Sequence, residues 1–342
     1  MGSLMARWGM SLPVLAAPMA GGTSTPAMVV AAGRAGGLGF LAAGYRSAEG
    51  IAGQIREVRA QGVVFGVNVF APNPVPVDQD AYRRYAEALR GDAGRLGAVL
   101  PEAPVEDDDF WAEKVELLLS DPVPLVSFTF GLPAAGLVKE LRAAGTSVLQ
   151  TVTNADEARA AAELGVDGLI VQASAAGGHS GTLTPERAVA DVPLPELVAR
   201  IRHAADLPVI AAGGLATSAQ IAEVLHAGAQ AAMVGTVLLR ADESGASAPY
   251  RQAIANSEHD TTVITRAFTG RPARGLRNRF IDRYEPLAPA GYPAIHHLTS
   301  PLRKAAAAAA ETGLLHLWAG TGHRHTRPEP AAEILTRLAR AL

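Results

Sequence analysis

The sequence predicts an α/β protein: a (β/α)₈ TIM barrel with an inserted segment after its third strand and a helical addition at the C-terminus. Its 342 residues, 49% hydrophobic and 18% charged, are enough for one large barrel. Eight short apolar runs, each typical of a fully buried parallel strand, follow one another with helical stretches between them. The later units are spaced by roughly 20 to 35 residues, as the crossover between parallel strands requires.

The expected strands and helices carry local signals. The helix that starts at Pro26 has a cap residue, Thr25, before it, and the helix from 47 to 60 gathers apolar residues on one face. A further helix, after the fifth strand, is capped at Asn154. The eight expected strands begin at Val14, Gly37, Val63, Pro124, Ser147, Gly168, Leu207 and Ala231.

A doubly wound open sheet is the competing arrangement of alternating strands and helices. Its phosphate-binding glycine turn belongs directly after the first strand and has the pattern G-x-G-x-x-G. Here that turn reads Pro18-Met-Ala-Gly-Gly and lacks the pattern. The closed barrel is therefore the favoured architecture.

Two segments fall outside the barrel pattern, which occupies residues 1–240. Residues 71–122 are irregular, and we expect an insertion there with one or two helices. We interpret its acidic run, Glu106 to Asp109, as a solvated helix start and not a metal site, because consecutive carboxylates do not converge easily on one ion. Residues 241–342 include the helix-forming run Ala305 to Ala310, and we expect them to form a helical addition packed against the barrel mouth.

The composition excludes several classes of function. The chain has no cysteine, so it has no disulfide, thiolate metal site or cysteine nucleophile. Its net charge of −3 provides no basic stripe for nucleic acid. No apolar run reaches the roughly 18 residues needed to span a membrane. The stretch after Met10 resembles a weak signal peptide, but Pro13 and Pro18 interrupt it, so we expect a cytoplasmic protein.

The stretch from Val166 to Gly181 carries the clearest candidate for chemistry. An apolar strand ends at Gln172, and His179 follows on a loop of small residues. A titratable side chain just past the carboxyl end of a strand lies where an α/β barrel keeps its active site. The alternative is a glycine-rich turn with an incidental histidine. The glycines that let this backbone approach a flat ligand closely are Gly177, Gly178 and Gly181.

Two further glycine turns predict a phosphate site. One is Ala212-Gly213-Gly214 after the seventh strand, and the other is Gly235-Thr236 after the eighth. In barrels these two loops commonly bind phosphate through backbone N–H groups, and glycine permits the close approach. Both could also be ordinary tight turns.

Amide side chains at other strand ends point to a flat heteroaromatic ligand. Amides suit the alternating donors and acceptors of a flavin's pyrimidine edge, although a buried amide more often satisfies a neighbouring backbone group. With one phosphate site, the set predicts FMN. The residues expected around its ring are Met19, Ala20, Gly21, Asn68, Gln150 and Gln172.

Five motifs, in this order, resemble those of the nitronate monooxygenase family, formerly called 2-nitropropane dioxygenases. The resemblance extends from about residue 11 to residue 320. The motifs are Ala17-Pro-Met-Ala-Gly-Gly, Phe65-Gly-Val-Asn-Val-Phe, Phe128-Thr-Phe-Gly-Leu-Pro, Gln172-Ala-Ser-Ala-Ala-Gly-Gly-His-Ser-Gly and Thr269-Gly-Arg-Pro-Ala-Arg-Gly.

The resemblance implies a (β/α)₈ barrel that binds FMN non-covalently and oxidises alkyl nitronates or nitroalkanes with O₂ to a carbonyl compound and nitrite. It implies that His179 is the active-site histidine. An imidazole with a pKa near neutral would take a carbon-bound proton from a nitroalkane, or hold the nitronate anion as an imidazolium. The implied FMN contacts are Met19, Asn68, Gln172, Gly178, Gly213, Gly214, Gly235 and Thr236.

This chain departs from the family pattern near the expected site. Many members have histidine where this chain has Thr129, and arginine or lysine where it has Ser180. Ala173 and Ala175 replace the usual glycine and glutamate. These changes remove charge and a second imidazole from the mouth.

Two other functions stay open from the sequence. The FMN-dependent enoyl-acyl-carrier-protein reductases share the barrel and the Gly-Gly-His element, and they or quinone reductases would reduce the flavin with NAD(P)H. The second alternative is a flavin-binding module without turnover. The position of His179 among the site glycines argues against it. We expect a small-molecule substrate with O₂, and a monomer or homodimer.

Overall fold

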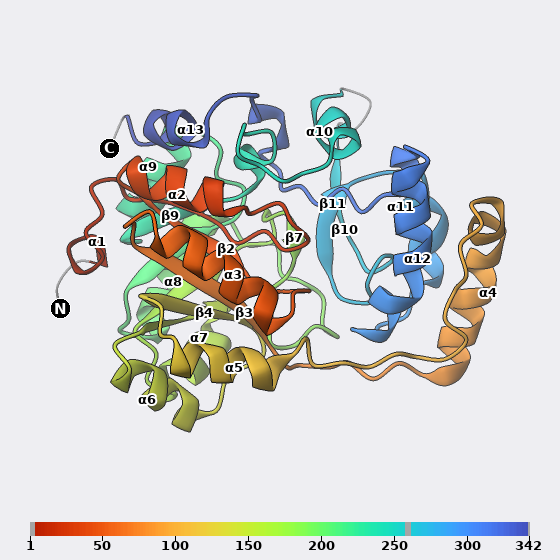
Figure 1. Ribbon diagram of the computed structural model, residues 1–342, viewed down its shortest axis with the longest axis horizontal. Helices are drawn as coiled ribbons and strands as arrows, with labels where there is room; N and C mark the ends of the chain where they lie inside the picture. Colours follow the sequence, from red (N-terminus) through yellow and green to blue (C-terminus); the bar gives the residue numbers. More distant parts are fainter. Residues whose placement is uncertain (1–3, 257–260, 341–342) are drawn as a thin grey trace.

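The computed structural model describes residues 4–256 and 261–340, and its centre is a closed barrel of parallel strands (Figure 1). The eight-stranded barrel predicted from the sequence is confirmed. The barrel closes where the last strand pairs with the first, with Met233 opposite Leu15. In neighbouring order the strands are β1 (Val14–Ala16), β2 (Leu38–Ala42), β3 (Phe65–Ala71), β4 (Leu125–Phe130), β5 (Ser147–Val152), β6 (Gly168–Gln172), β8 (Val209–Ala212) and β9 (Ala231–Val234).

Side chains of each strand alternate between the barrel interior and the helix layer. On β5, Leu149 packs in the interior with Phe40 and Met233. Val148 and Val152, at odd spacings from Leu149 on the same strand, pack in the outer layer against the helices. A strand has a period of two, so this alternation fixes which residue at each carboxyl end faces the mouth.

Helices cover the outside of the barrel, and several begin at the predicted caps. The Thr25 and Asn154 side chains each accept a hydrogen bond from the backbone N–H three residues ahead. Thr217 and Gln220 form a reciprocal capping box. After the N-terminal turn α1 (Leu4–Arg7), the barrel helices are α2 (Pro26–Arg34), α3 (Ala48–Arg59), α5 (Trp111–Ser120), α6 (Ala135–Ala143), α7 (Ala155–Glu163), α8 (Leu194–Ala204), α9 (Ser218–His226) and α13 (Ala331–Leu338).

The C-terminal portion contains strands as well as the expected helices. Beside α10 (Ala248–Ala255), α11 (Arg279–Tyr284) and α12 (Ala294–Ala308), it supplies β10 (Thr262–Thr265) and β11 (Ala273–Leu276). These strands form an antiparallel hairpin, and β11 pairs with the short strand β7 (Gly178–His179). The last helix, α13, returns to pack on α2 and β1 of the barrel.

The insertion after β3 contains two helices with different partners. Helix α5 packs on α3 and β3 as a barrel helix. Helix α4 (Gln79–Arg95) lies away from the barrel, beside α11 and α12 (Figure 1). It buries Tyr82, Tyr85 and Leu89 among apolar residues of the C-terminal portion. The insertion therefore joins the C-terminal addition to the barrel.

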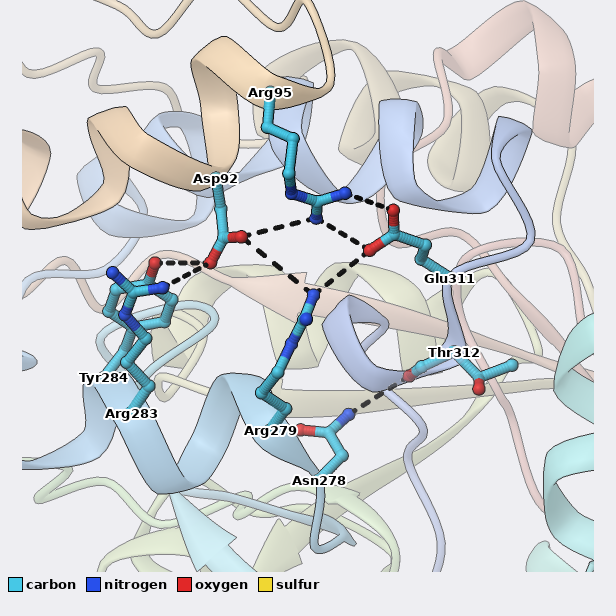
Figure 2. Close-up of polar contacts among 8 residues, drawn as sticks. All are labelled: Asp92, Arg95, Asn278, Arg279, Arg283, Tyr284, Glu311 and Thr312. Carbon is cyan, nitrogen blue, oxygen red and sulfur yellow. Dashed lines mark hydrogen bonds and ion pairs between the residues drawn. The ribbon is translucent and has the colours of Figure 1, made fainter.

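A network of ion pairs fixes α4 to the C-terminal portion (Figure 2). The buried carboxylate of Asp92 accepts a hydrogen bond from the Tyr284 hydroxyl at 2.7 Å. Arg95, on the same helix, pairs with both Asp92 (3.3 Å) and Glu311 (2.5 Å). Arg279 and Arg283 complete the network from α11. Charges that share partners in a network hold their geometry better than an isolated surface pair.

The acidic run is only partly the solvated helix start that the sequence suggested. Asp109 is turned inward, where it pairs with the buried Lys114 ammonium at 2.7 Å and accepts the backbone N–H of Tyr45 at 2.8 Å. Asp107 pairs with His297 on α12. Within the described part of the chain, no group of three or more acidic or histidine side chains is arranged to hold a metal ion. In the same residues, no helix combines the length and the apolar character that crossing a membrane requires.

Candidate active site

The barrel mouth has a polar half and an open half. The strand alternation turns Asn68, Thr129, Thr151 and Gln172, on the adjacent strands β3 to β6, toward the mouth. On the remaining four strands the inward position nearest the mouth holds a small residue, and larger side chains such as Phe40 and Met233 fill the interior below it. A mouth with polar groups on one side and open space on the other suits a flat, partly polar ligand. The small residues are Ala17, Ala42, Ala212 and Gly235.

Asn68 is fixed by the hydroxyl groups of the next strand. Its amide Nδ2 donates to Ser127 Oγ and to Thr129 Oγ1, both at 2.9 Å. Thr129 Oγ1 lies in turn 3.1 Å from Thr151 Oγ1. Thr129 thus orients Asn68 and links three strands.

Gln172 holds the loop that carries His179. Its Oε1 accepts the backbone N–H of Gly181 at 2.7 Å, and its Nε2 donates to the His179 carbonyl at 3.2 Å. A Cβ at Gly181 would lie 2.6 Å from Thr151 Cγ2, closer than real Cβ contacts allow, so this position requires glycine. The main observed contact of Gln172 is therefore with its own loop.

Gln150 does not face the mouth, contrary to the sequence-based expectation. On β5 the inward positions are Leu149 and Thr151, so the residue between them points to the helix layer. Its fully buried amide donates to the carbonyls of Gly131 (3.2 Å) and Thr151 (3.1 Å). The sequence placed it at a strand end, but the parity of the strand sends it outward.

The predicted phosphate turns lie together and meet a C-terminal segment. Gly213 and Gly214 have φ values of +113° and +75°, which favour glycine. A Cβ at Gly214 would lie 2.9 Å from Thr321 Oγ1. The Thr236 hydroxyl accepts the backbone N–H of Gly320 at 2.9 Å. The two loops and the Gly320–Thr321 segment thus form a cradle that added side chains would fill.

Sequence reasoning missed the C-terminal side of this cradle. A Cβ at Gly177 would lie 2.5 Å from the Gly320 nitrogen, so the histidine loop and the C-terminal segment are in direct contact. The signal was present as the glycine-rich run Ala319-Gly-Thr-Gly. It follows no barrel strand, so its position in the sequence does not mark it as part of the barrel mouth.

The turn after β1 closes over the open half of the mouth. Ser24 Oγ accepts the Met19 N–H at 2.9 Å and donates to the Ala17 carbonyl at 3.1 Å. A Cβ at Gly235 would lie 3.5 Å from Met19 Sδ. Met19 therefore borders the end of β9, and Ala20 and Gly21 follow it in the same turn.

His179 lies between the barrel and the hairpin of the C-terminal portion. Its backbone pairs with Ala273 on β11, and its Nε2 lies 2.9 Å from Thr269 Oγ1. The Thr269 hydroxyl can donate to the Arg271 carbonyl at 3.2 Å. Its contact with Nε2 is the shorter of the two, so we assign the hydroxyl hydrogen to that contact, which leaves the imidazole proton on Nδ1, available for donation to a ligand. The imidazole contacts the rings of Phe130, Tyr292 and Trp318, at centroid distances of 5.7, 5.9 and 5.4 Å.

Phe130 reaches this position through an unusual backbone conformation. By alternation, the residue after the inward Thr129 would point to the helix layer. Its φ of +83° instead lies in the left-handed region, and its ring packs against Phe70 at 4.4 Å and against His179. Non-glycine residues with positive φ concentrate at functional sites.

His179 is a weaker base than the sequence-based argument assumed. Burial, together with the positive charges of Arg271 and Arg303, lowers its pKa to about 3. The imidazole is therefore neutral at pH 7. Two more histidines from α12 and the segment after it, His296 and His316, also have pKa values well below the usual range because of burial. No feature of the sequence indicated that the C-terminal portion brings them near His179.

Lowering the pH from 7 to 5 is expected to destabilise the protein through these histidines. In the unfolded chain an imidazole binds a proton near pH 6.5, whereas in the folded protein these three bind one only at lower pH. Their contribution to the free energy of unfolding is therefore fully present above about pH 6.5 and is lost as the pH falls below it. Each histidine should lower the free energy of unfolding by about 1 kcal/mol per pH unit below the pKa of the unfolded imidazole. In urea unfolding across this range, His316→Gln should therefore show a shallower slope than the wild type. Equal slopes for the two proteins would contradict the assignment.

Comparison with known proteins agrees with this architecture. The sequence model of the family described as nitronate monooxygenase matches residues 4–340. A probable nitronate monooxygenase of Staphylococcus aureus (strain Newman) is 35% identical over 331 residues, which cover 95% of this chain and 93% of the relative. The same identity is found for the protein of strain USA300.

Two solved structures are also similar. Nitroalkane oxidase from Streptomyces ansochromogenes has a TM-score of 0.91 and 47% identity, covering 96% of this chain and 95% of that one. A mutant of FabK from Thermotoga maritima has a TM-score of 0.73 and 24% identity, covering 99% and 95%, and it shows a shared fold alone. The match over nearly the whole chain shows that this protein belongs to the nitronate monooxygenase family and is an oxidoreductase.

Proposed function

We propose that the protein binds FMN non-covalently at the barrel mouth and oxidises alkyl nitronates with O₂ to a carbonyl compound and nitrite. The observation that carries the proposal is the mouth itself, where a polar half, an open half and a glycine cradle adjoin one imidazole. The small inward residues leave room for a flat ring. The cradle at Gly214 and Gly235 is the kind of site that takes one phosphate.

Each part of the mouth has a separate task in this proposal. Bound FMN would supply the two-electron oxidation. Backbone N–H groups of the two glycine turns would hold its phosphate, with the Thr236 hydroxyl beside them. Asn68 and the backbone around Met19 and Gly178 would border the ring, while Gln172 keeps the histidine loop in place.

We assign His179 a role as a neutral hydrogen-bonding group rather than a base. A group whose pKa lies near 3 is poorly matched to removing a carbon-bound proton at pH 7. A neutral imidazole can still orient an ionised nitronate and stabilise the charge as it redistributes. This assignment predicts that the pre-ionised nitronate is a better substrate than the neutral nitroalkane.

The test is anaerobic reduction of the purified flavoprotein. An alkyl nitronate should bleach the flavin absorbance faster than NADH or NADPH, and readmission of O₂ should restore it. An NAD(P)H-dependent reductase, which the Gly177-Gly178-His179 element leaves open, is the second candidate. Rapid bleaching by NAD(P)H and none by nitronates would move the protein to that class. A flavin that reacts with neither would indicate a binding module.

A further inference from the structure

Two buried arginines lie beside the candidate active site without an acidic partner. Arg271, which follows Thr269 in the hairpin, has no exposed surface, and Arg303, on α12, is 6% exposed. Among the residues that the structure describes, neither guanidinium has a carboxylate oxygen within 4.0 Å. Buried charges in proteins are normally paired, because an unpaired one is costly.

Arg271 is held by backbone carbonyls, and part of its guanidinium is unused. Its Nε donates to the Ser180 carbonyl at 3.4 Å, and its Nη2 donates to the Thr182 carbonyl. The guanidinium carbon lies 4.0 Å from the centre of the Phe130 ring. Its Nη1 is buried and has no hydrogen-bond partner in the described part of the chain. Arg271 therefore brings a positive charge without a direct carboxylate partner to the back of the His179 loop.

Arg303 is held in a similar way, by neutral groups only. Its Nε donates to Thr299 Oγ1 at 3.1 Å, and its Nη2 donates to the His296 carbonyl at 2.9 Å. Its Nη1 lies 3.4 Å from the His316 ring. Both neighbouring imidazoles are neutral, because burial first and then the Arg303 charge lower their pKa. The positive charge of Arg303 thus adds to that of Arg271.

The nearest acidic groups are already engaged elsewhere. Glu157 lies beyond Thr182, where it accepts hydrogen bonds from the Thr182 hydroxyl and the Leu183 N–H. Asp109 lies beyond Tyr45 and is paired with Lys114. Glu157 attracts the Arg271 charge only from a distance, across Thr182, and neither carboxylate contacts either guanidinium.

Neutral donor groups stand in front of the two arginines. The hydroxyls of Tyr45 and Tyr292 lie 3.4 Å apart, and the Tyr45 ring stacks on His296 at 4.5 Å. Surrounding protein atoms desolvate the Tyr45 hydroxyl and raise its pKa to about 12, so the hydroxyl keeps its proton. The residue as a whole is still 38% exposed, whereas Tyr292 packs against His179. The group therefore reaches the protein surface at Tyr45.

We propose that Arg271 and Arg303 make this part of the mouth an anion site, which takes a small planar oxyanion such as nitrate or nitrite against His179 and the Tyr45–Tyr292 pair. Hydroxyl and imidazole N–H groups supply direct hydrogen bonds, and the two guanidiniums behind them supply the countercharge. The arginines act as positioning residues. Competition between such an anion and a nitronate rests on the proposed function, whereas anion binding itself does not.

The first experiment measures nitrate binding to the wild-type holoprotein, by calorimetry and by the change in flavin absorbance. Nitrate should bind saturably, with chloride at equal ionic strength as the control for screening. It should inhibit nitronate oxidation competitively. Absence of saturable nitrate binding would overturn the proposal. Nitrate binding without any nitronate oxidation would overturn the proposed function and leave the anion site standing.

The second experiment separates charge from loop support. Arg271→Met and Arg303→Met should each weaken nitrate binding by at least about tenfold and raise the nitronate KM more than they change kcat. Arg303→Lys, which keeps the charge, should retain most of the affinity. Arg266→Met is the matched control, since Arg266 also donates to two backbone carbonyls of the same loop region, those of Pro185 and Arg187. It should bind nitrate as the wild type does.

Two results would contradict the proposal. One is nitrate affinity unchanged in both methionine variants that retain flavin. The other is an equal loss in Arg266→Met, which would assign the effect to loop support. If Arg271→Met does not fold, Arg303→Met and Arg303→Lys decide the question, because they leave the contacts to Ser180 and Thr182 intact.

Discussion

Replacing His179 by asparagine is expected to lower kcat/KM for an alkyl nitronate by about 10²–10³, the usual effect of losing one donor to a developing oxyanion. FMN should remain bound, because the proposed phosphate cradle is formed by the turns after β8 and β9 and by the C-terminal segment. The amide lacks the imidazole's reach to Thr269 Oγ1, 2.9 Å from Nε2, so the donor loses its fixed orientation. Steady-state oxidation with O₂ uptake measures the effect.

The neutral nitroalkane distinguishes two roles of His179. If His179 orients an anion, both substrates should lose activity by a similar factor. If it removes the carbon-bound proton, the nitroalkane should lose a further 10²–10⁴-fold, the range of general-base catalysis. His203→Asn, on the exposed face of α8, is the control and should behave as wild type. Unchanged rates on both substrates with flavin retained would show that His179 is not an active-site residue.

The barrel could be predicted because its signals are local. Runs such as Val209–Ala212 are continuous and apolar, and Thr25 and Asn154 cap helices through contacts only three residues long. The position of Gln172 at the end of its strand followed from the same kind of run, whereas Asn68, also expected at a strand end, lies in the middle of β3. Where a strand's start is known, its carboxyl end follows within a residue or two.

An uncertainty of one residue within a strand is enough to change which side of the sheet a side chain is expected to face. Gln150 and Thr151 are adjacent on β5, and only Thr151 faces the mouth. The sequence drew attention to Gln150 because of its amide, while the run Ser147–Val152 carried no clear inward parity. A shift of one residue exchanges the two faces.

The contribution of the C-terminal portion could not be read from the sequence. Tertiary packing of the β10–β11 hairpin and α12 brings two arginines and two histidines near His179. These residues are Arg271, Arg303, His296 and His316. Their charge and burial then change the chemistry of His179, whose pKa the sequence alone placed near neutral. Electrostatic interactions between residues far apart in the chain leave no periodic pattern in the sequence from which they could be predicted.

Replacing Gly214 by aspartate is expected to abolish FMN binding at ordinary concentrations. The φ of +75° strains any side chain there, and a Cβ would lie 2.9 Å from both Ala175 Cβ and Thr321 Oγ1. A carboxylate in the cradle would also repel the phosphate, at a cost of about 3 kcal/mol for charges some 5 Å apart at an effective dielectric of 20. Repulsion alone then corresponds to a loss of about 10² in affinity. The purified variant should be colourless, and its Kd for added FMN should be raised at least by that factor.

Two matched variants separate the causes of that loss. Gly214→Ala introduces the same strain and crowding without the charge, so it should lose less affinity than the aspartate variant. Gly62→Asp adds a carboxylate at a glycine with φ of +69° and no atom within 4 Å of its Cβ, at the opposite end of the barrel before β3. It should remain yellow, because strain there does not touch the cradle. Stoichiometric FMN in Gly214→Asp would remove this cradle from the proposed phosphate site, since a carboxylate and a phosphate cannot share it without a measurable loss.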